Sequence, residues 1–206
     1  MATAPNYMVL IEGMDDINLA DAPAKINRAA LLAINNTASF ARADSADAMR
    51  KTYNFPGNYL DPSSGRLIVS QRAKLSNLEA VITGRQRPTS LARFVIQNNG
   101  VNHEGVVIEM KRGQATKLNR AFLMKLRRGG GDSGANMRLA VRVKGHAAPR
   151  KAYKPKMLSA NKNSSLWLLY GISVDQAFRY TKEMTADRAA LYLESEVSRL
   201  MGVDDL

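Results

Sequence analysis

Hydrophobic and polar positions near the amino terminus follow a helical period. After a short strand-like run at residues 7–11, apolar or small residues recur at three- and four-residue steps from Ile26 to Ala41, with polar side chains on the other faces. This spacing predicts an amphipathic helix. Residues 45–53 either continue it or start another helix, and the Pro and Gly of residues 54–58 predict a firm stop.

The middle of the chain is rich in β-favouring residues. Four runs predict strands: 66–69, 78–83, 105–110 and 121–126. The first two are expected to form one antiparallel pair, and residues 111–114 a tight turn after the third run. Residues 89–96 form either a third short strand or a linking arm.

A period of two is clearest from Met137 to Val143, where apolar and basic side chains alternate. The alternation predicts Arg138 and Arg142 on one sheet face and Leu139, Val141 and Val143 on the other. We therefore expect one buried face and one cationic face. The glycine-rich residues 129–134 before this strand are expected to be a hairpin tip.

The carboxy-terminal part begins with a basic segment containing two prolines, residues 146–165, which we expect to be an extended arm or linker. Ser173 and Gln176 have the spacing of a capping box and predict the start of a final helix. Its apolar stripe is expected to contain Ala186, Ala190, Leu193, Val197, Leu200 and Met201. Its far face is expected to be solvated or to meet a neighbour, and carries Asp187, Arg188, Glu194 and Glu196.

These elements predict an α+β fold: amino- and carboxy-terminal helices packed on a small, mostly antiparallel sheet with long basic loops. The 206 residues predict a single structural domain, 1–206, with the arm inside it. The first residues lack the features of a secretory signal and no apolar run is long enough to span a membrane, so we expect synthesis in the cytoplasm and no membrane partner.

Charge points to acidic partners. The chain has 30 Lys and Arg against 18 Asp and Glu, a net charge of +12. Residues 61–160 hold 20 of these cations and 5 of the acids. Nucleic acid, an anionic membrane or acidic protein surfaces would suit such a segment.

Catalytic and metal chemistry find little support. Residues 131–134 read Gly-Asp-Ser-Gly, as around the nucleophile of chymotrypsin-type proteases, but His103 and His146 have no recognisable triad setting. The glycines lack the Lys-Ser/Thr of a P-loop, and the acidic residues lack metal-ligand spacing. The chain has no cysteine. We expect no enzyme, no catalytic residue, no cofactor and no metal.

Instead, we expect side chains that face a partner. The cationic candidates are Arg112, Lys117, Arg120, Arg127, Arg128, Arg138, Arg142, Lys151, Lys154 and Lys156. The apolar candidates are Phe122, Trp167 and Tyr170.

The order of these pieces resembles the minor tail protein Z family of tailed bacteriophages, which are small basic tail-completion proteins, over roughly residues 24–201. Four stretches carry the resemblance: residues 24–29 at the start of the helix, the turn at 110–113, residues 120–123 together with Arg142, and residues 170–174. The chain departs from the family pattern at Ile172, where proline is common, and in the glycines of 129–134.

The resemblance implies a structural virion protein that acts in tail completion or head-to-tail connection, made in the host bacterial cytoplasm and then held in the tail or neck. It also implies other tail and neck proteins as partners, a symmetric homo-oligomeric ring, and non-specific contact of the basic residues with packaged DNA. The alternative is a free, non-specific DNA-binding protein. A hydrolase built on Ser133 is the third hypothesis.

Overall fold

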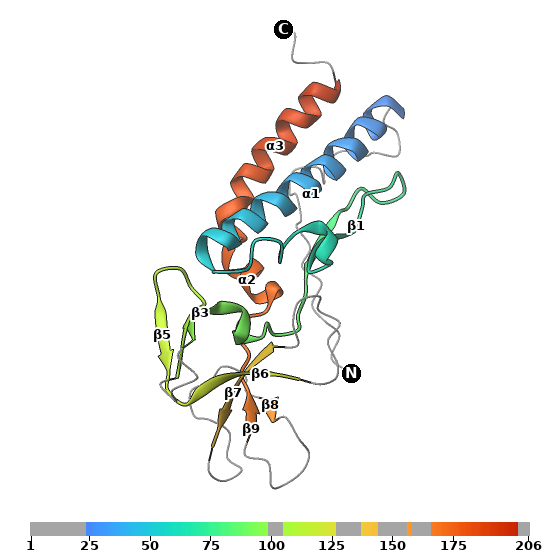
Figure 1. The fold of residues 1–206 in the computed structure, drawn as a ribbon. Helices are drawn as coiled ribbons and strands as arrows, with labels where there is room; N and C mark the ends of the chain where they lie inside the picture. Colours follow the sequence, from blue (N-terminus) through green and yellow to red (C-terminus); the bar gives the residue numbers. More distant parts are fainter. Residues whose placement is uncertain (1–23, 99–104, 127–136, 144–155, 158–165, 202–206) are drawn as a thin grey trace. The chain divides into compact units, whose positions relative to one another are not determined.

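The computed structural model of the chain describes residues 24–98, 105–126, 137–143, 156–157 and 166–201 (Figure 1). The fold is α+β, as predicted. The chain divides into two compact units, each built from separate stretches. Unit 1 comprises Met1–Met49, Leu60–Arg85 and Asp175–Leu206, and unit 2 comprises Arg50–Tyr59 and Gln86–Val174. The prediction of one structural domain over 1–206 stays a prediction.

Unit 1 is mainly helical. Its helices are α1 (Ala24–Thr52), whose last turn belongs to unit 2, α2 (Val174–Thr181) and α3 (Glu183–Met201). A short 3₁₀ turn, η1 (Pro62–Ser64), precedes the antiparallel strands β1 (Leu67–Gln71) and β2 (Val81–Gly84). The predicted pair is confirmed, although the second strand begins three residues later than expected. Helix α1 is continuous through Ser45, and the predicted stop after it is confirmed.

Helices α1 and α3 lie side by side and run antiparallel (Figure 1). Small side chains on α1, such as Ala33 and Ala46, are fully buried and let the helices approach closely. One part of the core groups Ala33 and Ile34 with Leu193 of α3 and Ala73. The helical period of alanines in α1 therefore marks its buried face.

Unit 2 contains two small antiparallel sheets. One has three strands in the order β3 (Val95–Asn98), β4 (Val106–Glu109), β5 (Ala115–Leu118). The other has the order β6 (Ala121–Lys125), β7 (Met137–Arg142), β9 (Leu166–Leu168), β8 (Lys156–Met157). A 3₁₀ turn, η2 (Leu91–Phe94), precedes β3. The expected single sheet is therefore wrong, since the described strands of the two units form three antiparallel sheets.

An aromatic cluster forms part of the core of unit 2. Phe55 stacks on Tyr59 with ring centroids 5.4 Å apart and lies tilted against Phe94 at 5.5 Å. The Tyr59 hydroxyl donates to the Thr89 hydroxyl at 3.2 Å. The residues after α1, predicted only to stop the helix, thus also build this core.

The predicted cationic face of β7 is wrong. Ala140 lies between Arg138 and Arg142 on that face and is fully buried, because it pairs with Phe122 of β6 and with buried Leu168 of β9. Leu139 on the opposite face is also fully buried. Both faces of the sheet are covered at its centre, and the arginines occupy the ends of the strand.

The predicted final helix is divided into α2 and α3 at Lys182. The start of α2 directly after Ser173 agrees with the prediction. Leu193 is buried as expected, but Ala186 and Ala190 are exposed, and Glu196 is buried rather than solvated. The buried stripe is therefore rotated toward Thr185 and Glu196.

Several predictions fall outside the described residues. These are the strand-like residues 7–11, the hairpin tip at 129–134, and the arm at 146–165 apart from β8. Of the candidate interface residues, Arg127, Arg128, Lys151 and Lys154 also lie there, and Lys156 is described only as part of the β8 backbone.

Candidate interaction surface

The sheet of β3, β4 and β5 is only partly covered by its own chain. Val106 and Ile108 on β4 are fully buried. In contrast, Ala115, Thr116 and Lys117 on β5 are all exposed although they alternate between the two faces. On β3, Ile96 is 50% exposed and the two residues after it are exposed as well. Strands β3 and β5 thus expose residues on both faces, and each has only β4 as a neighbour among the described strands.

The turn between β4 and β5 is fixed to the end of α1. The Arg112 amide donates to the Thr52 carbonyl at 3.1 Å, and its Nε donates to the Arg50 carbonyl at 2.6 Å. Carbonyls in the last turn of a helix have no following helical amide to bind, and a cation at that end also suits the helix dipole. Gly113 has a φ of 76° and its amide donates to the Glu109 carboxylate at 2.7 Å. A side chain at Gly113 would be strained, so this turn holds β5 in a defined place.

The turn between β5 and β6 contains an unusual backbone conformation. Arg120 has a φ of 64°, and no other described residue except glycine has a positive φ. This left-handed conformation costs about 1 kcal/mol for a residue with a Cβ. Arg120 immediately precedes β6, at the end of the sheet where Arg142 ends β7.

Seven cations lie in the described residues from β4 to β7, and two of them are engaged by backbone carbonyls. Arg112 caps α1, and Arg138 donates to the carbonyl of Met137 at 2.9 Å. The other five are exposed and make no side-chain hydrogen bond or ion pair with a described residue. This set, called here the open cations, comprises Lys111, Lys117, Arg120, Lys125 and Arg142.

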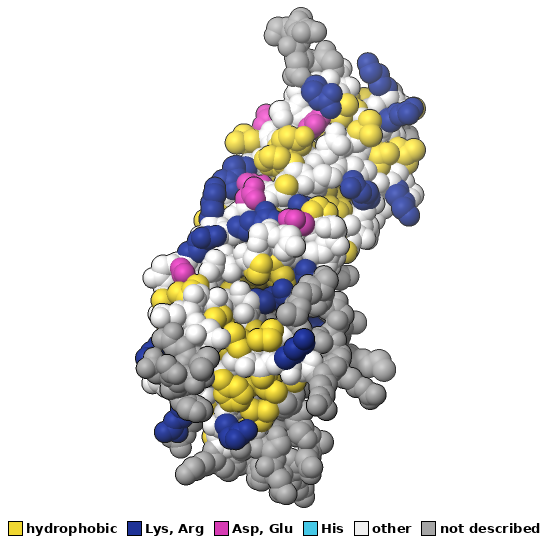
Figure 2. Space-filling model, in the orientation of Figure 1, with side chains coloured by type: hydrophobic (Ala, Val, Ile, Leu, Met, Phe, Trp, Pro, Cys, Tyr) yellow, Lys and Arg dark blue, Asp and Glu magenta, His cyan; other side chains and the backbone are white. Residues whose placement is uncertain are grey.

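Charge is divided unequally between the units. The sequence of unit 2 holds 19 Lys and Arg against 3 Asp and Glu, a net charge of +16. That of unit 1 holds 11 against 15, a net charge of −4. On the face shown in Figure 2, dark-blue Lys and Arg are more frequent than magenta Asp and Glu. Among the described residues of unit 2, Glu109 is the only carboxylate, and it is bound by Gly113.

The predicted apolar candidates have different environments. Phe122 on β6 is half-buried. Trp167 on β9 is half-buried, and its indole nitrogen is buried without a hydrogen-bond partner in the described part of the chain. Tyr170 forms an isolated bridge with Ser90. The strand register places Phe122 on the same sheet face as Arg142, and Trp167 on the opposite face.

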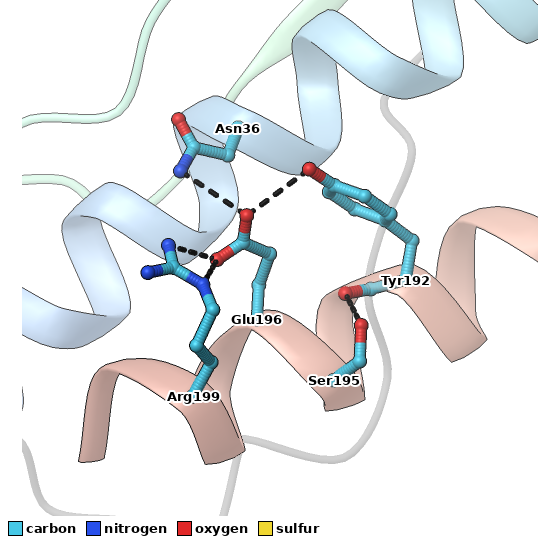
Figure 3. Close-up of polar contacts among 5 residues, drawn as sticks. All are labelled: Asn36, Tyr192, Ser195, Glu196 and Arg199. Atoms are coloured by element: carbon cyan, nitrogen blue, oxygen red, sulfur yellow. Dashed lines mark hydrogen bonds and ion pairs between the residues drawn. The ribbon is translucent and has the colours of Figure 1, made fainter. Parts of the chain in front are cut away.

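A second polar site joins the helices of unit 1 (Figure 3). Glu196 Oε1 accepts from the Tyr192 hydroxyl at 3.0 Å and from Asn36 of α1 at 3.4 Å. Its Oε2 accepts from Arg199 Nε at 2.9 Å and from the terminal guanidinium nitrogen at 2.6 Å. The bonds from Arg199 are the main reason that the pKa of Glu196 is lowered, and the bond to Glu196 raises the pKa of Tyr192. All four hydrogen bonds to the Glu196 carboxylate come from side chains of α1 and α3. The site therefore has a structural role at the contact between these two helices.

Sequence reasoning missed two of these features. Strand β5 has no alternating hydrophobic pattern, because neither of its faces is buried. It is also too short for its sequence alone to predict a strand. The Glu196 site depends on Asn36, which lies 160 residues away. Lys117 and Arg120 were recognised as candidate cations, but the exposed strand between the two turns was not.

Comparison of the chain with protein-family models, curated proteins and solved structures finds no significant match. In the described part of the chain, no group of three or more His, Cys, Asp or Glu side chains is placed to hold a metal ion. None of the helices that the structure describes has the length and apolarity needed to cross a membrane.

Proposed function

We propose that this chain is a structural protein of a tailed-bacteriophage virion that completes the tail or connects it to the head. It is made in the host cytoplasm and works in the tail or neck through protein–protein interfaces. Its partners are other tail and neck proteins and further copies of itself in a symmetric ring. No chemical reaction is assigned to it.

The observation that carries this proposal is the open sheet of unit 2. Strands β3 and β5 expose residues on both faces, and β5 leaves one backbone edge free of any described strand. Strand edges of this kind pair readily with another chain. A protein that remains between neighbouring subunits covers such strands in its assembled state.

Two of the stretches that carry the family resemblance contribute residues to the packing of unit 2, which suits a structural role. Gly171 is buried, and a Cβ there would lie 2.8 Å from Leu91 Cδ2 and 2.9 Å from Met110 Sδ. Met110 and Gly171 belong to two of the resembling stretches. Two of the stretches that carry the resemblance therefore pack directly against each other.

Mass spectrometry of purified virions tests this proposal. Particles produced by cells that carry the gene should contain the chain at a fixed copy number, and a gene deletion should leave tails that fail to join heads. Absence of the chain from mature particles, with normal joining in the deletion, would overturn the proposal.

The open cations support the second candidate, a free non-specific DNA-binding protein. In that case, binding of duplex DNA by the isolated protein should fall steeply with salt, because Lys and Arg displace condensed counterions. A steep salt dependence in a monomer that is missing from particles would favour the DNA-binding role.

A Ser133→Ala variant tests the third hypothesis, a hydrolase built on Ser133. The structural proposal expects that this variant leaves the particle yield unchanged.

A further inference from the structure

The outer edge of β5 pairs with no other strand in the part of the chain that the structure describes, and such an edge can accept one more strand. On one face of the sheet, Thr116 and Leu118 of β5 pair with the fully buried Ile108 and Val106 of β4. Leu118 is itself half-buried, whereas Thr116 is exposed. An added strand with apolar side chains beside these two residues would extend the buried face and satisfy the free backbone groups of the edge.

Charge around β5 selects an acidic strand. Lys117 lies within β5, Lys111 lies in the turn before it, and Arg120 lies in the turn after it. All three belong to the open cations and are exposed. An incoming strand flanked by carboxylates would neutralise these side chains, and a basic or neutral strand would not.

The chain contains a segment of this kind at its amino terminus. Residues 7–11 read Tyr-Met-Val-Leu-Ile, which is β-favouring and entirely apolar apart from the tyrosine hydroxyl. Glu12, Asp15 and Asp16 follow directly, and residues 1–23 contain no Lys or Arg. The segment therefore combines an apolar strand sequence with the charge opposite to that around β5.

We propose that residues 7–16 of a neighbouring copy add to the edge of β5 as a further strand. Backbone hydrogen bonds supply affinity, apolar side chains beside Thr116 and Leu118 extend the core, and the acidic residues meet Lys111, Lys117 and Arg120. Repetition from copy to copy links subunits head to tail, and such a contact closes into a ring when the rotation allows it. The inference rests on the proposed function and deepens it by naming the contact through which two copies join.

Cysteine cross-linking tests the proposal directly, because the natural chain has no cysteine. One full-length copy carries Val9→Cys, and a second carries Ala115→Cys, Thr116→Cys or Lys117→Cys in separate preparations. Adjacent strands place opposing Cβ atoms within reach of a disulfide. Mixing under mild oxidation should give a mixed disulfide with at least one β5 position, read by mass spectrometry without reduction.

The matched control carries Ser63→Cys, an exposed position in unit 1. The β5 positions should cross-link to Val9→Cys on the order of tenfold more than this control, and a peptide of residues 5–18 in excess should suppress the product. Reversing charge with Lys117→Glu in the Thr116→Cys copy should lower the yield about threefold, as expected for loss of an exposed ion pair. Restoring the yield with Glu12→Lys in the donor copy, three residues from Val9, would support the charge pairing.

Two results would overturn the proposal. One is cross-linking at all three β5 positions no higher than at Ser63. The other is a chain with both cysteines that cross-links only within itself, which would place the segment on its own sheet. Because the experiment uses isolated protein, its failure leaves the virion role standing, and absence from virions leaves the strand contact standing.

Discussion

Tyr192 on α3 lies flat against Phe40 on α1, with ring centroids 4.3 Å apart and ring planes within 3°. The hydroxyl at the far end of Tyr192 donates to Glu196, which also accepts from Asn36 of α1. Tyr192 therefore packs against α1 with its ring and holds the Glu196 carboxylate with its hydroxyl. Asn36 of α1 donates to the same carboxylate. Aromatic stacking and the buried carboxylate together define how α1 and α3 pair.

Replacing Glu196 with Ala should lower the free energy of unfolding by about 1 kcal/mol, because the hydrogen bonds of Asn36, Tyr192 and Arg199 lose their acceptor. Urea denaturation at neutral pH measures the change. Glu194→Ala, two residues earlier and exposed, is the matched control and should change stability by less than about 0.5 kcal/mol. Equal effects of the two variants would show that the Glu196 contacts contribute nothing beyond an ordinary surface carboxylate.

Acid should remove the contribution of Glu196. Its pKa is lowered in the folded chain, chiefly by the hydrogen bonds from Arg199, so folding favours the ionised carboxylate. The resulting stability is present above the unfolded glutamate value of about 4.3 and is lost as the pH falls through the lower folded value. The difference in unfolding free energy between the natural chain and Glu196→Gln should therefore be constant near neutral pH and shrink on acidification. A difference that grows toward low pH would contradict this assignment.

Gly171→Ala should destabilise unit 2, because the new Cβ would lie 2.8 Å from Leu91 and 2.9 Å from Met110. Both contacts are ends of flexible side chains that can shift in part, and we expect a loss of about 1–3 kcal/mol. Gly57→Ala is the control, since nothing lies within 4 Å of its Cβ position. That variant should be neutral or slightly more stable in thermal unfolding. If both variants unfold alike, the close packing at Gly171 is not important for stability.

The parts of the fold that the sequence predicts have strong local signals. Helix α1 has a long 3.6-residue period with Pro and Gly directly after it, and these signals predict the helix and its end. The continuation of the helix from Ser45 to Thr52 is one of two alternatives that the sequence leaves open. The turn at 111–114 and the start of α2 after Ser173 are likewise set by residues within a few positions. These elements can be predicted because the residues that determine them are close together in the sequence.

The features that sequence reasoning missed depend on neighbours far along the chain. Ala140 carries no strong pattern of its own and is buried because Phe122 and Leu168 flank it across the sheet. A glutamate on a helix is ordinarily solvated, and Glu196 is buried only because α1 packs over it. Strand β5 has no buried face to leave a period of two. Tertiary context decided all three.

Arg120 offers a test that separates backbone strain from the function of a side chain. Its φ of 64° suits glycine far better than a residue with a Cβ. Arg120→Gly should therefore be about 1 kcal/mol more stable to urea than Arg120→Ala, since both lose the guanidinium and only alanine keeps the strain. Both variants should lose the same share of the cross-linking yield at β5, because the lost charge is common to them. An equal loss of cross-linking yield in the two variants would show that the Arg120 cation contributes to the contact despite the strain. A yield that is higher for Arg120→Gly than for Arg120→Ala, in step with stability, would show that Arg120 acts only through the turn that it forms.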